Sequence, residues 1–502
     1  MSARWIKPLL KIKPHIHFDN SYARLPGQFY TRQNPVPVSA PSLIRINHAL
    51  AQKLDIDPVW LKSDEGISVV AGNKVPDGGE PIATVYAGHQ FGGWNPQLGD
   101  GRAILLGEVL NNQNERYDFQ LKGSGPTPYS RGNDGRAPLG PVLREYIVSE
   151  AMATFRIPTT RTLAVAATGD PVYRQGILPG AILVRIAKSH IRIGTFEFFS
   201  FRNDQESLRL LTDHVIQRHY PKAAEQKNPV LAMLDAVIEN QAYLIAAWQQ
   251  IGFIHGVMNT DNMLLSGETI DYGPCAFMDE YHPGTVFSSI DRNSRYAYGN
   301  QPAIGHWNLR NLAQVLIPLL NKNRDKAREL AQDSINKYMN LLTKSYQNGM
   351  MMKLGLCNVM PDDIKLIKDL LAIMAEEKMD YTLTFRYLSD LAGDDARDGV
   401  GDLITFSEKF SFWLERWKKR LILDEQTSIQ RQARMYALNP VFIPRNHLIE
   451  EVIQAAVGEG NFNLFHQLVD IITHPFEYKA ALKKYALAPR PEQVVNETFC
   501  GT

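Results

Sequence analysis

The segment from Gly252 to Cys275, GFIHGVMNTDNMLLSGETIDYGPC, is the feature that most constrains the fold. It places an acid and an amide side by side at Asp261 and Asn262, and a second acid at Asp271. The apolar run and turn between them predict a hairpin over residues 263–270 that brings Asn262 close to Asp271. Hard divalent cations that act on phosphates take few oxygen ligands from the protein, and phosphate and water fill their remaining coordination positions. The segment therefore predicts a magnesium site, although the same residues also suit ordinary turns.

Overall composition indicates a globular protein with more than one packed unit. The chain has 502 residues, of which 44% are hydrophobic and 21% are charged. Its 54 basic and 53 acidic residues leave a formal net charge of +1, so charge favours neither a nucleic-acid nor a membrane partner. We find no apolar run of about 20 residues, the length that spans a bilayer, and expect no membrane segment. We also expect a monomer.

The cysteines and the N-terminus bear on the compartment. Cys275, Cys357 and Cys500 lie far apart and lack metal-ligand spacing, which favours a reducing compartment without a disulfide framework. The N-terminus is basic but has no apolar core of signal-peptide length. We therefore expect a cytoplasmic protein if the source is bacterial and a mitochondrial one if it is eukaryotic.

Four regions follow from changes in composition along the chain. Residues 1–80 are rich in proline and predict an extended arm that wraps a domain, with one helix near 42–54. Residues 81–180 predict a small lobe with a glycine loop, a strand lysine and a helix glutamate. Residues 181–488 predict a helical lobe that contains the metal site. Residues 489–502 form a tail with Cys500 near its end.

Glycines precede the first predicted strand of the small lobe. Gly99 and Gly101 lead through Arg102 into the apolar run 103–106, a pattern typical of a turn entering a strand. Glycine lets backbone amides approach a phosphate because no side chain intervenes. A simple tight turn would give the same sequence.

A lysine on the next strand and a glutamate on the following helix are candidates for an ion pair. The strand 117–122 alternates so that Lys122 points away from its apolar face. Glu145 lies early in a helix that continues to Phe155. A carboxylate in this position would keep the ammonium charged and oriented for phosphate contact, but the sequence leaves this pairing as one possibility among several. The loop between them, 123–136, is either functional or simply mobile.

Two arginines lie in apolar surroundings after that loop. Strands are predicted at 161–168 and 180–187, and the second carries Arg185. Arg192 lies an odd number of residues further on, so a straight strand would place the two on opposite faces, whereas a bend near Ser189 would let them converge. Buried guanidinium groups require carboxylates or phosphates.

The remainder of the chain is helical by its apolar spacing. We predict helices at 205–219, 231–250, 307–320, 325–347, 361–376, 406–421, 427–436, 448–458 and 462–473.

Taken in order, these features resemble a protein-kinase-like fold. The run from His255 to Asn262 aligns with the kinase catalytic-loop pattern, and Asp271-Tyr272-Gly273 aligns with the kinase acid-aromatic-glycine triplet. Val257 stands where a kinase keeps its catalytic acid, and valine cannot accept a proton. Ile104 replaces the third glycine of the phosphate loop. The fold class we expect is α+β, a bilobal pseudokinase with an N-terminal extension and a large helical C-terminal part.

Three longer segments closely resemble the selenoprotein O family, also called the YdiU family. They are YAGHQFGGWNPQLGDGRA, QLKGSGPTPYSRGNDGRAPLGPVLREY and GFIHGVMNTDNM. The resemblance implies a protein adenylyltransferase that moves AMP from ATP to Ser, Thr or Tyr hydroxyls with release of diphosphate. It implies Mg²⁺, or Mn²⁺, held by Asn262 and Asp271, with Asp261 as the base and Glu145 paired with Lys122. It also implies nucleotide contacts from Gly99, Gly101, Arg102, Lys122, Asp134, Gly135, Arg185, Arg192 and Asp271.

The implied chemistry accounts for the departures from a kinase. Transfer of AMP requires attack on the α-phosphorus, so cations must gather around the departing β- and γ-phosphates. The resemblance implies that ATP binds turned around relative to a kinase and that Asp261 takes the role missing at Val257. A phosphotransferase and a catalytically silent ATP-binding scaffold are the alternatives. Cys500 matches the family's C-terminal selenocysteine or cysteine, and is either a redox-regulatory thiol or an inert one.

Overall fold

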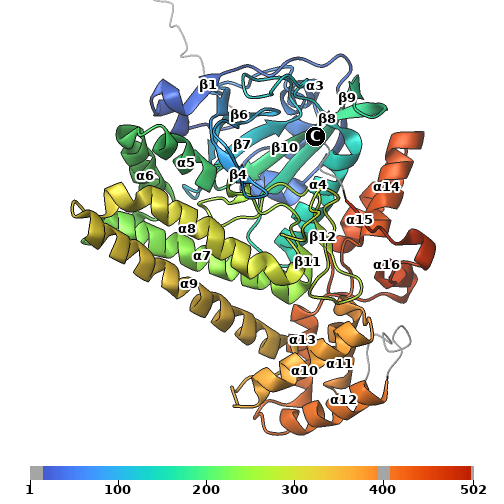
Figure 1. The fold of residues 1–502 in the computed structure, drawn as a ribbon. Coiled ribbons are helices and arrows are strands. Elements are labelled where there is room, and N and C mark those ends of the chain that lie inside the picture. Colours follow the sequence, from blue (N-terminus) through green and yellow to red (C-terminus); the bar gives the residue numbers. More distant parts are fainter. Residues whose placement is uncertain (1–14, 394–406, 499–502) are drawn as a thin grey trace, which may run out of the picture.

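The computed structural model describes residues 15–393 and 407–498, and combines one large antiparallel sheet with many helices (Figure 1). The sheet has the strand order β1-β3-β6-β7-β10-β9-β2, with β8 paired to β10 beside this path. Its strands are β1 Tyr30–Arg32, β2 Ser42–Ile46, β3 Ile82–Thr84, β6 Ala103–Leu110, β7 Arg116–Lys122, β8 Ala137–Pro138, β9 Arg161–Tyr173 and β10 Ile177–Ala187. Two small pairs, β4 Gly88–Gln90 with β5 Gly93–Asn95 and β11 Phe253–Ile254 with β12 Ala276–Phe277, lie outside it.

The sheet is buried on both faces, which explains its nearly continuous apolar strands. In β6, Ile104 and Leu106 join a core with the first three helices, whereas Leu105 joins the larger core that contains α4. Alternation along the strand therefore divides its side chains between two cores. The first helices are α1 His48–Lys53, α2 Pro58–Leu61, α3 Asp64–Val70 and α4 Leu139–Thr154.

Helices make up most of the chain after β10. In Figure 1, α7, α8 and α9 run side by side below the sheet, α10 to α13 form a group at their far end, and α14 and α15 flank α4. Their bounds are α5 Ile193–Phe201, α6 Gln205–His219, α7 Pro229–Ile251, α8 Gln301–Leu320, α9 Arg324–Lys353, α10 Asp363–Glu376, α11 Tyr381–Leu391, α12 Glu408–Leu421, α13 Ser428–Leu438, α14 Asn446–Glu459, α15 Asn463–Ile472 and α16 Lys483–Ala486. A mixed α and β architecture of this kind is consistent with the predicted α+β class.

One helix is longer and more apolar than the sequence analysis recognised. Within the described residues α7 has 23 residues, and the mean hydropathy of its most apolar 18-residue window is 1.4, enough by length and composition to cross a membrane. It packs against α8 and α9, and 56% of its most apolar window is buried inside the protein. A central helix of a helical core has this same composition, because neighbouring helices surround it.

The segment predicted as a helix at 42–54 is half strand, and that prediction is wrong in its first part. Residues Ser42–Ile46 form β2, which pairs with β9, and the helix begins only at His48. The side chain of Asn47 accepts a hydrogen bond from the amide of Leu50 and so caps α1. The apolar and β-branched run before Asn47 satisfies its backbone in the sheet instead.

The predicted hairpin at 263–270 is also wrong. Leu264 forms a bridge with Arg192, and Thr269 forms a bridge with Thr159, so the two arms pair with other segments rather than with each other. The turn itself is present, since the amide of Gly267 donates to the carbonyl of Leu264. Apolar residues on both sides of a short turn satisfy the hairpin pattern whether or not they pair locally.

Other elements lie elsewhere than predicted, or were not predicted at all. Strand β10 crosses residue 180, where the sequence analysis divides the two lobes, and β1 and β2 bring the N-terminal region into the sheet. The helix α5 lacks an apolar period because every residue from Ile193 to Phe199 is buried. The tail is docked at Thr498, whose amide donates to the carbonyl of Phe287 at 2.7 Å. Cys500 lies outside the described residues.

Candidate active site

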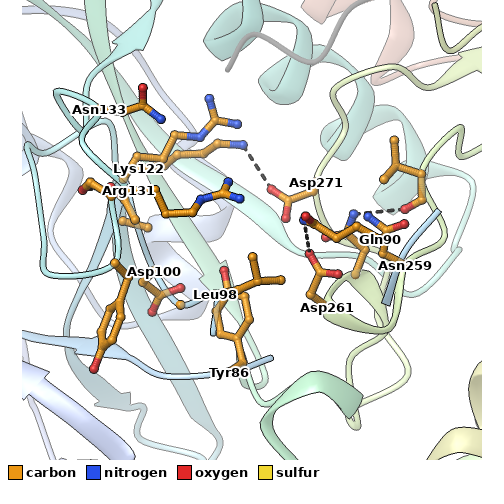
Figure 2. Close-up of a pocket in the computed structure, with 18 of the residues that line it drawn as sticks. Tyr86, Gln90, Leu98, Asp100, Lys122, Arg131, Asn133, Asn259, Asp261 and Asp271 are labelled. Carbon is orange, nitrogen blue, oxygen red and sulfur yellow. Dashed lines mark hydrogen bonds and ion pairs between the residues drawn. The ribbon is translucent and has the colours of Figure 1, made fainter. Parts of the chain in front are cut away.

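A cavity of about 460 Å³ lies between the sheet and the segment that follows α7 (Figure 2). One wall comes from the strand ends and loops of the sheet, and the other from residues 257–274. The predicted residues that line it are Gly99, Gly101, Arg102, Lys122, Gly135, Arg185, Arg192, Asp261, Asn262 and Asp271. Segments far apart in sequence thus meet at one cavity, but the individual roles of these residues remain predictions.

Lys122 ends β7 at the cavity and is held by two carboxylates. Its Nζ lies 2.5 Å from Glu145 Oε2 on α4 and 3.2 Å from Asp271 Oδ1. Glu145 is enclosed by the protein, because α4 packs against β9 and β10. The lysine and glutamate paired in the sequence prediction are therefore in contact, and Asp271 is a second partner.

Arg185 and Arg192 converge on the same carboxylate. Arg185 donates to Glu145 Oε1 through Nε at 2.8 Å, and its Nη2 lies 2.7 Å from Asp271 Oδ1. Arg192 Nη1 lies 3.4 Å from Asp271 Oδ2, and its guanidinium carbon lies 4.5 Å from the ring centre of Tyr86. The chain leaves β10 after Ala187 and turns into α5, which supplies the bend that the odd spacing required.

Asp271 is consequently a partly buried acid in a strongly positive environment. Burial opposes its ionisation, but Arg185, Lys122 and Arg192 outweigh burial and hold the pKa of this carboxyl well below its usual value. Its φ is +62°, a left-handed conformation that aspartate tolerates better than most residues. Asp271 therefore stays ionised and faces the cavity beside the cations, as Figure 2 shows for Lys122.

Asp261 has the opposite environment. It lies on the short 3-10 helix Thr260–Asn262, and burial raises its pKa to about 6 despite the nearby Arg192. Its Oδ1 is enclosed without a hydrogen-bond partner, and its Oδ2 accepts a long bond of 3.4 Å from Gln90 Nε2 (Figure 2). The β4–β5 pair can approach this closely because residue 88 is glycine: a Cβ there would lie 2.6 Å from Asp261 Oδ1.

Asn262 presents its amide oxygen rather than its amide nitrogen as a free ligand. Its Nδ2 donates to the carbonyl of Val257 at 3.0 Å, which leaves Oδ1 available for a cation. No cluster of three or more His, Cys, Asp or Glu side chains suited to a metal occurs in the described parts of the chain. One carboxylate at Asp271 and one amide oxygen at Asn262 fit Mg²⁺, which keeps several waters and takes further ligands from substrate phosphates.

His255 and Val257 have structural places in this segment. His255 is fully buried, and its Nε2 lies 2.9 Å from the carbonyl of Ile270, next to Asp271. Val257 lines the cavity where the kinase pattern has an acid. Among the lining residues from this segment, Asp261 is therefore the carboxylate without a cationic partner on its side chain.

The glycines before β6 are required by close packing. Gly99 has a φ of +131°, and a Cβ on it would lie 2.5 Å from the ring of Tyr129. Gly101 accepts a hydrogen bond from the hydroxyl of Ser130, and a Cβ there would lie 2.7 Å from the carbonyl of Tyr129. The loop 123–136 thus packs onto the glycine turn and is an ordered wall of the cavity.

Asp134 is the predicted nucleotide contact that does not line the cavity. Its carboxylate is 40% exposed and forms an ion pair with Arg174 at 3.0 Å, and its Oδ1 accepts from the amide of Arg136. The neighbouring Gly135 does line the cavity. Asp134 therefore orders the loop that carries Gly135, and its own contact with the nucleotide stays a prediction.

Sequence reasoning missed several polar and aromatic lining residues, notably Tyr86, Gln90, Asp100, Tyr129 and Asn259. Gln90 belongs to the β4–β5 pair, which is only three residues long on each side and has no periodic signal. Its flanking glycines at 88, 92 and 93 were the available indication of a tight turn.

Comparisons with known proteins cover nearly the whole chain. A family model described as "Protein adenylyltransferase SelO" matches residues 13–473. The chain is 54% identical over 489 residues to "Protein nucleotidyltransferase YdiU" of Rhodopseudomonas palustris strain BisB5, covering 97% of this chain and 99% of the relative. It is 54% identical over 487 residues to the protein of the same name from Rhizobium etli strain CFN 42, covering 97% of each. These matches include the sheet, the cavity and most of the helices.

Proposed function

The chain belongs to the family of the protein adenylyltransferase SelO, and we propose how the residues of its cavity carry out that reaction. The activity is transfer of AMP from ATP to a protein, with release of diphosphate. The observation that carries the assignment of roles is the contrast between two aspartates in one cavity, Asp271 paired with three cations and Asp261 with no ion pair on its carboxylate among the described residues. Nucleotide transfer needs both environments, one for the phosphates and one for the acceptor's proton.

The cations beside Asp271 suit the departing diphosphate. Lys122, Arg185 and Arg192 share Asp271 as a common anionic partner, and Arg102 adds positive charge to the same wall. A phosphate chain that accepts hydrogen bonds from these groups replaces part of the negative charge that Asp271 otherwise supplies to them. Charge then develops on the leaving oxygens next to preorganised donors, which is the largest single source of stabilisation in such reactions.

Asn262 and Asp271 are the residues that would hold a divalent cation. Phosphate contact with the arginines and Lys122 leaves the Asp271 oxygens to the cation, and Asn262 Oδ1 is already free of internal bonds. A bound Mg²⁺ or Mn²⁺ would neutralise phosphate charge and polarise the phosphoryl oxygens. Glu145 keeps Lys122 and Arg185 in place throughout, because it contacts both from behind the sheet.

Asp261 is suited to accept the proton of the attacking hydroxyl. Its burial makes it a stronger base than an ordinary carboxylate, and its Oδ1 has no internal hydrogen bond to give up. Serine, threonine and tyrosine hydroxyls are the acceptors that this arrangement serves. Val257 supports transfer of AMP over transfer of the γ-phosphate, since the acid that a kinase uses is absent from its usual place.

The order of elements supports a kinase-like bilobal arrangement for this function. The sheet with α4 corresponds to the small lobe, and the helices from α6 onward to the large one. The active protein is proposed to be a monomer.

Labelled ATP tests the proposal directly. The full chain is incubated with Mg²⁺ and ATP carrying the label on either the α- or the γ-phosphate, and protein-bound label is followed together with diphosphate release. Label from the α-position, stoichiometric with diphosphate, supports AMP transfer. Label from the γ-position alone would establish a phosphotransferase, and ATP binding without either product would leave only a scaffold.

A further inference from the structure

The β4–β5 hairpin, residues 88–95, forms the side of the cavity next to Asp261 and is fixed to the segment that carries it. The amide of His89 donates to Thr260 Oγ1 at 2.8 Å, and the amide of Phe91 donates to Asn259 Oδ1 at 3.0 Å. Gln90, between them, reaches Asp261 (Figure 2). This hairpin is therefore part of the rigid surroundings of the proposed base, on the side away from Lys122.

A second segment, residues 290–296, packs against this hairpin. Ile290 lines the cavity mouth and is 59% exposed. Asp291, which is buried, accepts from the amides of Arg295 and Tyr296 at 2.9 and 2.8 Å and so fixes the turn. Tyr296 donates its hydroxyl hydrogen bond to Asn259 at 2.6 Å, and its ring lies 5.1 Å from that of Phe91.

Arg295 lies beside the turn at Gly92, and its guanidinium contacts aromatic rings. Its guanidinium carbon lies 4.8 Å from the ring centre of Trp307 and 5.7 Å from that of Tyr296. Its Nε and Nη2 are enclosed without a hydrogen-bond partner, and within the described part of the chain we find no ion pair for it. The turn at Gly92 approaches it so closely that a Cβ would lie 3.6 Å from the guanidinium.

An arginine in this state is a site prepared for an anion. Guanidinium is always charged, and aromatic contacts compensate only part of the cost of removing it from water. Arg185 and Arg192, which line the cavity, have carboxylate partners instead. The third guanidinium nitrogen of Arg295, Nη1, is not enclosed, and a carboxylate from outside would gain a charge-assisted hydrogen bond there.

We propose that Arg295, with the β4–β5 hairpin and residues 290–296, forms a docking site for acidic side chains of the acceptor protein near the hydroxyl that receives AMP. The inference rests on the proposed function, since it places the acceptor on the Asp261 side of the cavity. The occupant is a protein segment with Glu or Asp close to its Ser, Thr or Tyr. Because the wall is rigid, the spacing between acid and hydroxyl is fixed.

Paired synthetic peptides test this. Each peptide carries one threonine in an alanine and glycine background, with either Glu or Gln at one position on either side. Transfer of label from α-labelled ATP gives kcat and KM for each pair, and fluorescence anisotropy gives peptide binding independently of transfer. We expect one spacing at which the Glu peptide has about a tenfold lower KM than its Gln twin, the gain of one charge-assisted hydrogen bond.

The variant Arg295→Gln should bring the ratio of the two KM values to about one, because it weakens binding of the Glu peptide alone. Arg295→Lys should keep part of the difference. Arg292→Gln, which removes an exposed charge from the same segment, is the matched control and should keep the full ratio. Equal binding of Glu and Gln peptides at every spacing, or a ratio that survives Arg295→Gln in a folded variant, would overturn the inference. A preserved difference in binding with no α-label on any acceptor would instead overturn the proposed function.

Discussion

Asp261 and Asp271 lie on one segment and line one cavity, but their surroundings give them opposite properties. Asp271 is held by Lys122, Arg185 and Arg192, and its pKa is far below the usual range. Asp261 has one unpartnered oxygen and one long hydrogen bond, and its pKa rises to about 6. Desolvation acts to raise the pKa of both carboxyls, so it does not make the difference. The position of three cations does.

The comparison separates two tasks that a sequence motif alone would assign to either acid. An ionised carboxylate next to cations can exchange them for phosphate and take a metal. A desolvated carboxylate without cations is a better proton acceptor and a poorer ligand. Four substitutions, ordered from the largest expected effect to the smallest, test whether this division holds.

Asp271→Ala should lower the rate of AMP transfer by at least about a thousandfold, since stabilisation by the metal and of the phosphates is worth several kcal/mol. The measurement is α-label transfer at saturating Mg²⁺ and ATP. Asp271→Asn, which keeps the shape but not the charge, should be impaired nearly as much. Retention of activity within about tenfold in both variants would mean that Asp271 is only a structural partner of the arginines.

Asp261→Asn should lower kcat by about 10²- to 10⁴-fold, the usual contribution of a general base, with little change in ATP affinity. A neutral amide avoids the cost of a buried charge without a partner, so the melting temperature should not fall. Calorimetric titration with ATP and a thermal melt check both points. A large loss of ATP affinity would place Asp261 with the phosphate ligands and erase the contrast with Asp271.

Glu145→Gln should raise KM for ATP by about tenfold and lower stability by about 1–3 kcal/mol, because Lys122 and Arg185 lose a charged partner. The matched control is Glu150→Gln on the same helix, where Glu150 pairs with Arg161 instead. The control should lose comparable stability, read as a lower melting temperature, but keep its KM for ATP. Equal rises in KM for both variants would show that the effect comes from general loosening of α4.

Gln90→Ala should have the smallest effect, a fall in kcat of about three- to tenfold, since its hydrogen bond to Asp261 is long and neutral. KM for ATP should not change. Gln97→Ala, an exposed change in the following loop, should leave both parameters as they are. A Gln90 variant with full kcat would mean that Asp261 is positioned by burial alone.

Much of the local structure could be predicted from the sequence, because short-range periodicity and turn residues determine it. The helix Gln205–His219 has the predicted bounds, and Lys122 ends a strand as its alternation indicated. The prediction of a helix over 42–46 and of a hairpin over 263–270 failed for a common reason. In both segments the pairing partner is distant in sequence, β9 in one case and residues 159 and 192 in the other.

The sequence by itself determined the chemical inventory of this protein: a lysine, two arginines and a glutamate in apolar settings, two aspartates with an asparagine, and a valine where an acid was expected. Tertiary structure alone decided which aspartate receives the cations. It buried Asp261 under Gly88 and Gln90, turned Arg185 and Arg192 onto Asp271, and left Arg295 without an anion. The physical reason is that charge interactions and desolvation depend on distances between segments far apart in the chain, which residue types and spacing do not specify.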